Sequence, residues 1–250
     1  MEITLDLKKS LEENASIYFD KGKKSKRKVI GAMDTVADAK KRLVKLEKKK
    51  PEKKEIVAKR KQQWFEKFRW FYTSTGFLVV GGRDATSNEI VIKKHVDKDD
   101  LIFHTDMAGS PFFVLKTEGK EIDAETFSEV ADATATFSKA WKLGISSQKV
   151  FYVTKEQVTK EANSGEYLTK GSFMIRGKTT YITNSVNVCI GLKDGVIMGG
   201  PCKSVRAYDP DAIELKQGDN KVSDAAKKIA KKLDADLDEV IRAMPSGGFR

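Results

Sequence analysis

Residues 1–61 show an apolar pattern with helical spacing. Six apolar positions are separated alternately by three and four residues, as in the a/d seam of a heptad repeat. They are Val29, Ala32, Val36, Ala39, Leu43 and Leu46. Pro51 ends this helix, because the residue before a proline disfavours the helical region, and residues 52–66 resume a helical composition. The pattern predicts an antiparallel helical hairpin, a short coiled coil, with its turn near residues 49–52.

Beyond residue 61, short apolar and aromatic runs alternate with turn residues, which indicates strands. Thr75-Gly76 separates two such runs and predicts a hairpin. Lys193-Asp194-Gly195 predicts a second hairpin, because Asp-Gly between apolar runs favours a tight turn. The expected strands are 64–72, 77–80, 101–104, 112–115, 149–153, 179–183, 187–192, 196–198, 205–208 and 212–215.

Helices in the same region are predicted from capping residues, whose side-chain oxygens accept from the free amides of a first turn. The expected caps are Asp84 or Ser87 for residues 85–96, Asp123 for one helix to residue 143, Ser223 for a helix to residue 233, and Asp236 for a last helix that Pro245 stops. The predicted fold class is therefore α+β. A helical hairpin (1–61) precedes a single domain (62–218) with a largely antiparallel meandering sheet packed by helices, and a C-terminal helical segment (219–250) packs on that domain.

The charge of the chain is uneven. Its net charge is +11, and residues 1–61 carry 20 Lys and Arg against 10 Asp and Glu, whereas the remainder carries 27 against 26. This asymmetry indicates a polyanionic partner for the N-terminal segment, although lysines also commonly form the solvated face of a coiled coil. No apolar run approaches the roughly 20 residues that span a bilayer, and no signal peptide precedes the first helix, so we expect a cytoplasmic protein without a membrane partner. Cys189 and Cys202 are expected to be small core residues rather than a disulfide or a zinc site.

Candidate chemistry collects in polar loops. His104-x-Asp106 at a strand end, with Asp84 and Glu166, would suit a metal-dependent nuclease. No catalytic or nucleotide-binding motif accompanies them, so we expect no enzymatic activity, no metal and no cofactor. Glycines beside cations and aromatics instead suit an RNA backbone with unstacked bases. The candidate RNA-binding residues are Arg83, Asp84, His104, Asp106, Ser110, Glu166, Tyr167, Lys170, Ser172, Arg176 and Lys178, together with Lys23, Lys24, Lys26, Arg27 and Lys28.

Four stretches carry a family resemblance: WFEKFRWF, GGRDATSNE, HTDMAGS and SGEYLTKGSFMIRGK. They resemble the NFACT-R domain, the RNA-binding module of the NEMF/RqcH proteins, and residues 1–61 are similar to part of the middle coiled coil of that family. Residues 219–250 resemble the C-terminal segment of its archaeal members. The NFACT-N and helix-hairpin-helix domains of the family have no counterpart in these 250 residues.

The resemblance implies a ribosome quality control factor that contacts tRNA or rRNA on stalled large ribosomal subunits and supports C-terminal tailing of nascent chains. It also implies either that a separate NFACT-N-containing chain is a partner or that the sequence is a fragment. The alternative is a protein-interaction module that docks a ribosome or quality-control partner through its coiled coil. The oligomeric state stays open.

Overall fold

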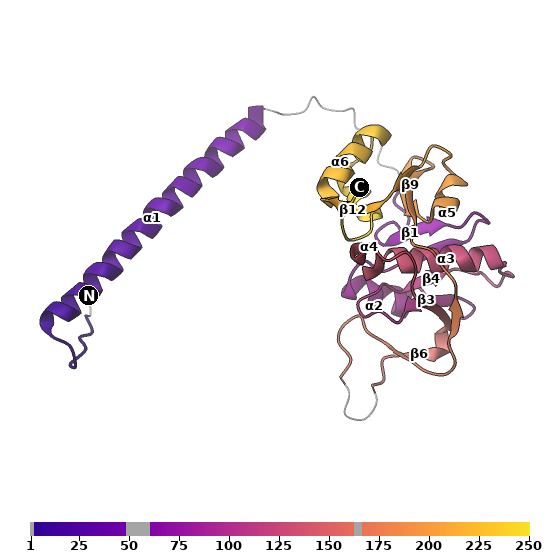
Figure 1. Ribbon diagram of the computed structural model, residues 1–250, viewed down its shortest axis with the longest axis horizontal. Helices are drawn as coiled ribbons and strands as arrows, with labels where there is room; N and C mark the ends of the chain where they lie inside the picture. The colour runs from indigo at the N-terminus through magenta and orange to yellow at the C-terminus, as the bar shows by residue number, and fades with distance from the viewer. Residues whose placement is uncertain (1–2, 49–60, 163–166) are drawn as a thin grey trace. The chain divides into compact units, whose positions relative to one another are not determined.

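The computed structural model describes residues 3–48, 61–162 and 167–250. The chain divides into two compact units, Met1–Lys61 and Gln62–Arg250 (Figure 1). None of the described helices combines the length and the apolar character that crossing a bilayer requires. Because the chain divides at residue 61, each unit is described by itself.

The first unit contains one long helix, α1 (Leu11–Lys48). Ser10 and Glu13 cap its start reciprocally, because Ser10 N–H donates to Glu13 Oε2 at 2.7 Å and Glu13 N–H donates to Ser10 Oγ at 3.2 Å. The side chain of Asn14, which is 5% exposed, accepts from Asp6 N–H and donates to Asp6 O, so the preceding segment folds back on the helix. Most of the predicted second helix (52–66) lies outside the described residues, and residues 61–66 form coil and turn.

The main sheet of the second unit has six antiparallel strands in the order β1-β2-β4-β3-β5-β8. Their bounds are β1 Arg69–Tyr72, β2 Leu78–Gly81, β3 Leu101–Thr105, β4 Phe113–Leu115, β5 Val150–Thr154 and β8 Thr180–Ile182. The predicted β1–β2 hairpin is confirmed, with Arg69 opposite Gly81, but residues 64–68 form coil and turns rather than strand. Phe71 on β1, Phe103 on β3 and Phe113 on β4 are fully buried.

A second sheet joins β10 (Val196–Gly200), β9 (Val188–Lys193) and β11 (Ile213–Leu215). The predicted hairpin through Asp194-Gly195 is confirmed, and both turn residues adopt positive φ (51° and 77°). Beyond β10 the chain forms α5 (Cys202–Arg206), so the strand predicted at 205–208 is wrong. The structure pairs Cys189 with Cys202 in a disulfide, which corrects the expectation of two free core cysteines. The pairing arises because Gly200, two residues before Cys202, lies opposite Cys189 in the hairpin.

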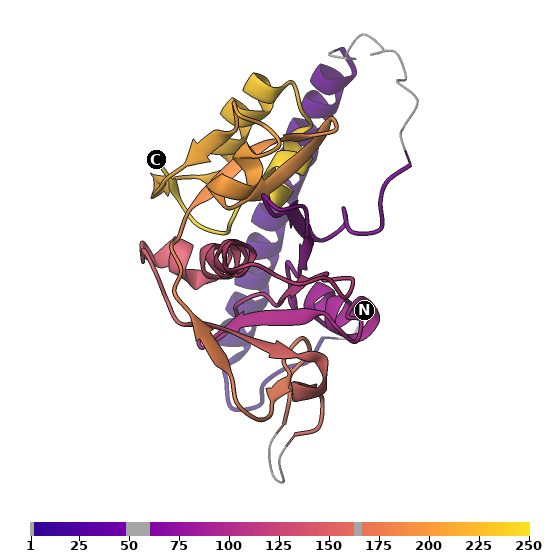
Figure 2. The ribbon, with the colours of Figure 1, turned by 90° about the vertical axis from the view of Figure 1, so that its right-hand side faces the viewer.

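Helix α3 (Ala124–Thr136) lies between the two sheets, and Figure 2 shows it end-on. Its apolar side packs on β3, β4 and β5. Glu129 of this helix is 3% exposed and accepts from Ser74 N–H at 2.8 Å and from Ser204 Oγ–H at 2.9 Å. One buried carboxylate thereby ties α3 both to the β1–β2 turn and to α5.

The single helix predicted to residue 143 is divided in two. Asp123 caps α3 as expected, accepting from Thr126 N–H at 2.6 Å, but the helix ends at Thr136 with Phe137 as its C-cap. Ser138 is extended and its hydroxyl accepts from Ala140 N–H at 3.0 Å, so it caps a new helix, α4 (Lys139–Leu143). An internal serine that can cap competes with helix continuation, which is the physical reason for the break.

The remaining elements frame these layers. α2 (Ala85–Lys94) follows β2, and the 3₁₀ turn η1 (Lys155–Gln157) leads into the small pair β6 (Val158–Thr159) and β7 (Met174–Ile175). β12 (Gln217–Asn220) bridges to Phe249, and α6 (Val222–Leu233) packs against α7 (Leu237–Ala243). Asp236 caps α7 as predicted, but Lys221 rather than Ser223 holds the N-cap position of α6.

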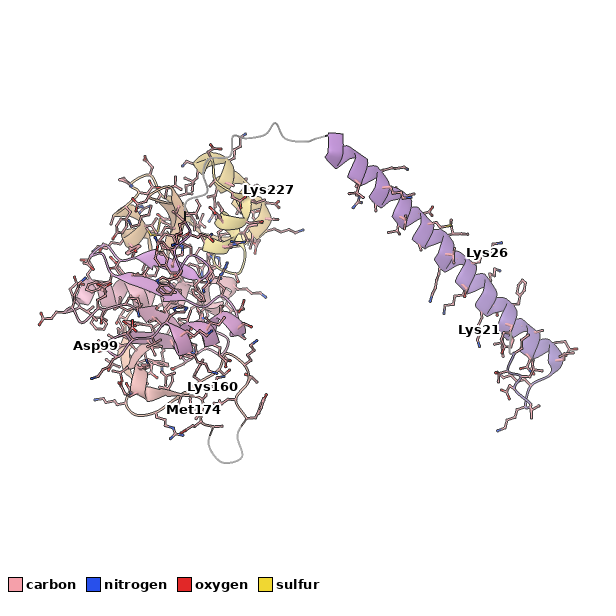
Figure 3. The ribbon with its side chains drawn as sticks, turned by 180° about the vertical axis from the view of Figure 1, so that it is seen from behind. Lys21, Lys26, Asp99, Lys160, Met174 and Lys227 are labelled. Carbon is pink, nitrogen blue, oxygen red and sulfur yellow. A yellow bond between two sulfur atoms is a disulfide. The ribbon has the colours of Figure 1, made fainter. Side chains whose placement is uncertain are left out.

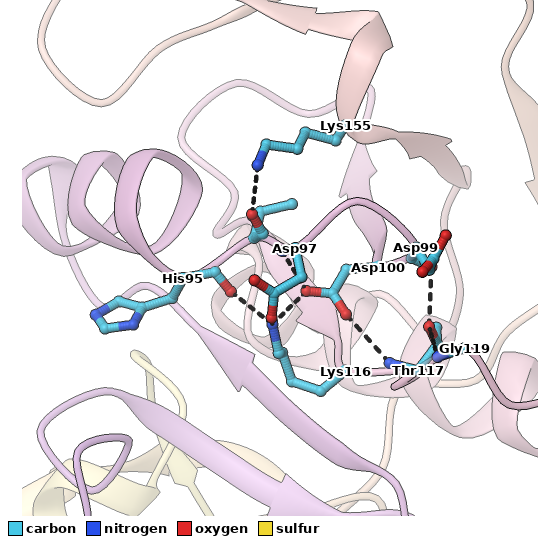
Figure 4. A network of polar contacts seen from close by, with 9 residues as sticks. His95, Asp97, Asp99, Asp100, Lys116, Thr117, Gly119 and Lys155 are labelled. Carbon is cyan, nitrogen blue, oxygen red and sulfur yellow. Dashed lines mark hydrogen bonds and ion pairs between the residues drawn. The ribbon is translucent and has the colours of Figure 1, made fainter.

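A buried polar network fixes the loops beside β4 (Figure 4). The ammonium group of Lys116 donates to His95 O at 3.0 Å, to Asp97 Oδ2 at 2.6 Å and to the carboxylate of Asp100. The side chain of Lys116 is 12% exposed and that of Asp100 is 2% exposed. Asp100 also accepts from the backbone N–H groups of Asp97 and Thr117, so its buried charge is fully bonded.

Candidate nucleic-acid interface

Four loops of the second unit surround a groove of about 400 Å³. Residues 82–85 lie between β2 and α2, residues 108–112 between β3 and β4, residues 137–142 around the start of α4, and residues 170–173 before β7. The antiparallel order β2-β4-β3 brings the first two loops to one end of the sheet. Three loops that sequence reasoning singled out separately therefore meet in one place.

Tight backbone contacts hold the loops together. Gly171 has a φ of +79°, and a Cβ on it would lie 2.5 Å from the backbone of Ala85. The Gly171 N–H donates to Glu89 Oε2 at 3.1 Å, and Lys160 Nζ lies 3.4 Å from the same oxygen. The hydrogen bond from the Lys93 side chain and, to a lesser extent, that from the Gly171 amide lower the pKa of Glu89 to about 2. Glu89 thus stays ionised and fastens the 160–173 segment to α2.

The groove is strongly cationic. Its charged lining residues are Arg69, Arg83, Lys139, Lys142, Lys170 and one acid, Asp84. Among the ion pairs of the described residues, none involves any of these five cations. Asp84 is engaged by α2, since its carboxylate accepts from Ser87 N–H at 2.7 Å, which confirms the predicted cap and lowers the Asp84 pKa. The groove therefore carries uncompensated positive charge.

Both arginines of the groove are half-buried and held in place. Arg69 Nη1 donates to Met244 O at 2.8 Å, and its guanidinium lies 4.5 Å from the centroid of the Phe137 ring. Burial, and then the charge of Arg83, lower the pKa of Arg69 to about 10. Arg83 Nη2 donates to Lys67 O at 2.7 Å, and burial followed by the nearby charge of Arg242 lowers its pKa. Both groups remain cationic at neutral pH, and an anion in the groove would relieve their mutual repulsion.

His104 and Ser110 line the groove but are already bonded within the protein. The ring of His104 stacks on Phe112 at 3.9 Å, and Nδ1 lies 3.0 Å from Pro111 O; because a carbonyl only accepts, Nδ1 carries the proton. Burial lowers the pKa of His104, which keeps the ring neutral. Ser110, 4% exposed, donates to Met107 O at 2.8 Å. These two side chains hold the 108–112 loop in place, and other lining residues supply the exposed contact surface of the groove.

The remaining candidates of the body are divided between the groove and its surroundings. Ser172 lines the groove beside Lys170. Asp106 points elsewhere and accepts from the Tyr181 hydroxyl at 3.1 Å. Arg176 lies 3.8 Å from Glu161, and the exposed Lys178 is outside the groove lining. Two further candidates are Tyr167, whose side chain is 87% exposed, and Glu166, which lies outside the described residues.

The candidate lysines of the first unit form an exposed cationic stretch on α1. Lys23, Lys24, Lys26, Arg27 and Lys28 are all exposed, and none takes part in the ion pairs of the described residues. Figure 3 shows the neighbouring Lys21 and Lys26 projecting from this helix.

Sequence reasoning missed three groove cations: Arg69, Lys139 and Lys142. Arg69 belongs to an aromatic strand, and the alternation of residues along a strand does not show whether its side chain faces bulk solvent or a groove. Lys139 and Lys142 fall within the single helix predicted to residue 143, where no local signal distinguishes them from other exposed lysines. The usable signal was Ser138, because a cap at this position would have placed both lysines at a helix start.

The structure also contains one group of three potential metal ligands among the described residues: Cys189, Cys202 and Glu214, with ligand atoms within 4.8 Å of one another. The two sulfur atoms are bonded to each other, so this group does not fit a metal ion. His104 and Asp106 are not part of it.

Comparison with known proteins identifies the groove-bearing region. Residues 67–177 match the family described as NFACT protein RNA binding domain. The chain contains an NFACT-R domain. All four groove loops fall inside this NFACT-R region, whereas α1 and the C-terminal helices lie outside it.

Relatives extend the similarity beyond the NFACT-R domain. The archaeal Rqc2 homolog aRqcH of Methanocaldococcus jannaschii is 42% identical over 204 residues, covering 78% of this chain and 30% of that protein. The ribosome quality control complex subunit NEMF homolog of Drosophila melanogaster is 32% identical over 233 residues, covering 88% of this chain and 23% of that protein. The chain thus spans less than a third of the length of these relatives. Among solved structures, the C-terminal part of the fibronectin/fibrinogen-binding protein of Streptococcus suis aligns at 19% identity and a TM-score of 0.39 over 70% of this chain and 77% of that one, which is too distant to carry an argument.

Proposed function

We propose that this chain is an RNA-binding component of a ribosome quality control factor. It contacts tRNA or rRNA on stalled large ribosomal subunits, in the cytoplasm, and supports C-terminal tailing of nascent chains without itself catalysing a reaction. The observation that carries the proposal is a groove inside an NFACT-R domain, lined by five cations that form no ion pair among the described residues. The Drosophila melanogaster relative is a ribosome quality control complex subunit NEMF homolog, and this supports the process in which the chain acts.

The groove suits the phosphate backbone of RNA for a physical reason. Arginine presents a fork of donors that matches phosphate oxygens, and lysine supplies a mobile point charge. Two half-buried arginines beside three exposed lysines combine both modes. Phosphate contacts of this kind give affinity and orientation without reading a sequence.

The exposed lysines of α1 provide a second set of phosphate contacts in this proposal. Five cations within residues 23–28 lie on one helix without ion-pair partners among the described residues. In this proposal a separate chain with an NFACT-N domain acts alongside this one, because the chain spans less than a third of the length of these relatives.

The test is a salt titration of the affinity of the full chain for tRNA and for large-subunit rRNA. Each neutralised phosphate contributes about 0.7 to the slope of log affinity against log salt for single strands. Replacing four groove cations by glutamine should therefore lower the slope by about 3. The groove variant changes Arg83, Lys139, Lys142 and Lys170, and the matched control changes Lys98, Lys221, Lys228 and Lys231, which are exposed elsewhere. Equal slopes for the two variants would contradict an RNA-binding groove.

A protein-docking role remains the second candidate, because α1 presents unpartnered apolar side chains. Val29, Met33, Val36 and Leu43 are 54–67% exposed at helical spacing. Such a face is typical of a coiled-coil partner surface. If this role dominates, RNA affinity at low salt will be absent, and replacing Met33 and Val36 by glutamate will abolish recovery of the chain with large ribosomal subunits.

A further inference from the structure

The groove has more positive charge than an internal RNA phosphate can neutralise. Among the described residues, its lining contains five cations and one carboxylate, and that carboxylate is already held by the first turn of α2. An internal phosphodiester carries a single negative charge, whereas a phosphate monoester carries about −1.5 to −2 at pH 7. The excess therefore favours a group with more charge than the RNA backbone offers at any one position.

Each aromatic ring that lines the groove already has a partner within the protein. Phe137 is covered by the guanidinium of Arg69 at 4.5 Å, and Phe112 is covered by the stacked ring of His104 at 3.9 Å. Lys160 Nζ lies over the ring of Phe173 at 4.7 Å; Figure 3 labels Lys160 near β6. Since base recognition in single strands depends on free aromatic faces, the groove is built for charge rather than for stacking.

Arginines converge at one end of the groove from separate elements. Arg69 lies on β1 and Arg83 follows β2, while Arg242 lies on α7. Arg69 also lines a small neighbouring hollow of about 40 Å³ together with Arg242, whose carbonyl oxygen lies 3.4 Å from Arg69 Nη1. The C-terminal helices thereby complete a like-charged cluster at the edge of the NFACT-R domain.

From this arrangement we infer that the groove recognises the terminal phosphate monoester of an RNA strand in addition to the backbone phosphodiesters beside it. The inference rests on the proposed RNA-binding function and specifies the chemical group that the groove takes. Arg83 and Arg69 would fork onto the phosphate oxygens, while Lys139 and Lys170 neutralise its second charge.

The experiment compares three forms of one single-stranded RNA of twelve nucleotides: 5′-phosphorylated, 3′-phosphorylated, and with hydroxyl groups at both ends. Affinities for the full chain are measured at 150 mM salt. We expect one of the phosphorylated forms to bind about tenfold more tightly than the hydroxyl form, since the added charge meets unpaired cations. Arg83→Gln should remove most of this preference, whereas the matched variant Lys98→Gln should keep it.

The outcomes are distinguishable. Equal affinity for all three RNAs overturns the terminal-phosphate inference and leaves RNA binding by the chain intact. A preference that survives Arg83→Gln and Lys170→Gln together also overturns it, because the preference then arises outside the groove. Absence of binding to every RNA overturns both this inference and the proposed function. Circular dichroism of each variant shows that loss of preference is not loss of fold.

Discussion

Replacing Lys116 by methionine tests the buried network beside β4. Methionine keeps the length and apolar stem of lysine but removes the cation that lies against Asp100. The Asp100 carboxylate, 2% exposed, then keeps two backbone N–H donors, at Asp97 and Thr117, and loses its only ion-pair partner among the described residues. Breaking a buried pair costs about 3–5 kcal/mol, and the two remaining donors place the expected loss at about 3 kcal/mol.

The matched control is Lys120→Met. Lys120 lies 2.8 Å from Glu118, but the two side chains are 66% and 70% exposed. An exposed ion pair contributes less than about 1 kcal/mol, because water screens it and two long side chains must be ordered. The two variants thus remove the same chemical group from a buried and from an exposed pair.

The assay is urea unfolding of the full chain at pH 7, followed by the fluorescence of the buried Trp70 and Trp141. Adding Asp100→Asn to Lys116→Met should recover part of the lost free energy, because the uncompensated charge is gone. The reasoning is refuted if Lys116→Met costs no more than Lys120→Met, or if the second substitution recovers nothing.

Three further predictions concern the loops and the disulfide. The folded pKa of Glu89, near 2, lies below its ordinary 4.5, so its stabilising bonds persist at neutral pH and are lost as the pH falls from about 4.5 towards 2. At pH 5, Glu89→Gln should speed hydrogen exchange of the Gly171 amide about tenfold. Unchanged exchange would show that other contacts hold the loop. His104→Ala should lower the free energy of unfolding by about 2 kcal/mol, because the ring stack on Phe112 and the hydrogen bond to Pro111 O are lost. Its RNA affinity in gel shifts should stay within about twofold of the wild type; weaker binding without destabilisation would instead make His104 a contact residue. Replacing Cys189 and Cys202 by alanine should lower the free energy of unfolding by about 3 kcal/mol relative to the oxidised wild type, as expected for a disulfide that closes a loop of this length. Dithiothreitol should lower the melting temperature of the wild type alone, and an equal response of both proteins would mean that the bond does not form.

Local sequence signals predicted the elements of this fold where the signal and its consequence lie within a few residues. The hairpin at Asp194-Gly195 forms because two adjacent positive-φ residues favour a tight turn there. Asp84, Asp123 and Asp236 cap helices because their carboxylates reach amides two or three residues onward. At the start of α6 the same signal placed the cap wrongly, because Lys221 holds the N-cap position without a side-chain cap bond.

The candidate site was only partly predictable. Glycines beside Arg83 and Lys170 identified two loops from their composition, but nothing local shows that these loops meet. Arg69 and Lys142 were missed because their contribution depends on strand pairing and on the helix break at Ser138. Tyr167, Arg176 and the other candidates outside the groove share its composition without sharing its position, so their role stays a prediction.

Residue identities alone were enough to indicate the class of the protein, through an uneven basic charge, capped helices, aromatic strands and the motifs of an RNA-binding family. These depend on residue identity and on contacts within a few positions along the chain. That five cations line one groove, and that Cys189 is bonded to Cys202, became evident from the folded chain. Both depend on pairing between strands that are distant in sequence, and the order of pairing follows from packing the whole core rather than from any single stretch.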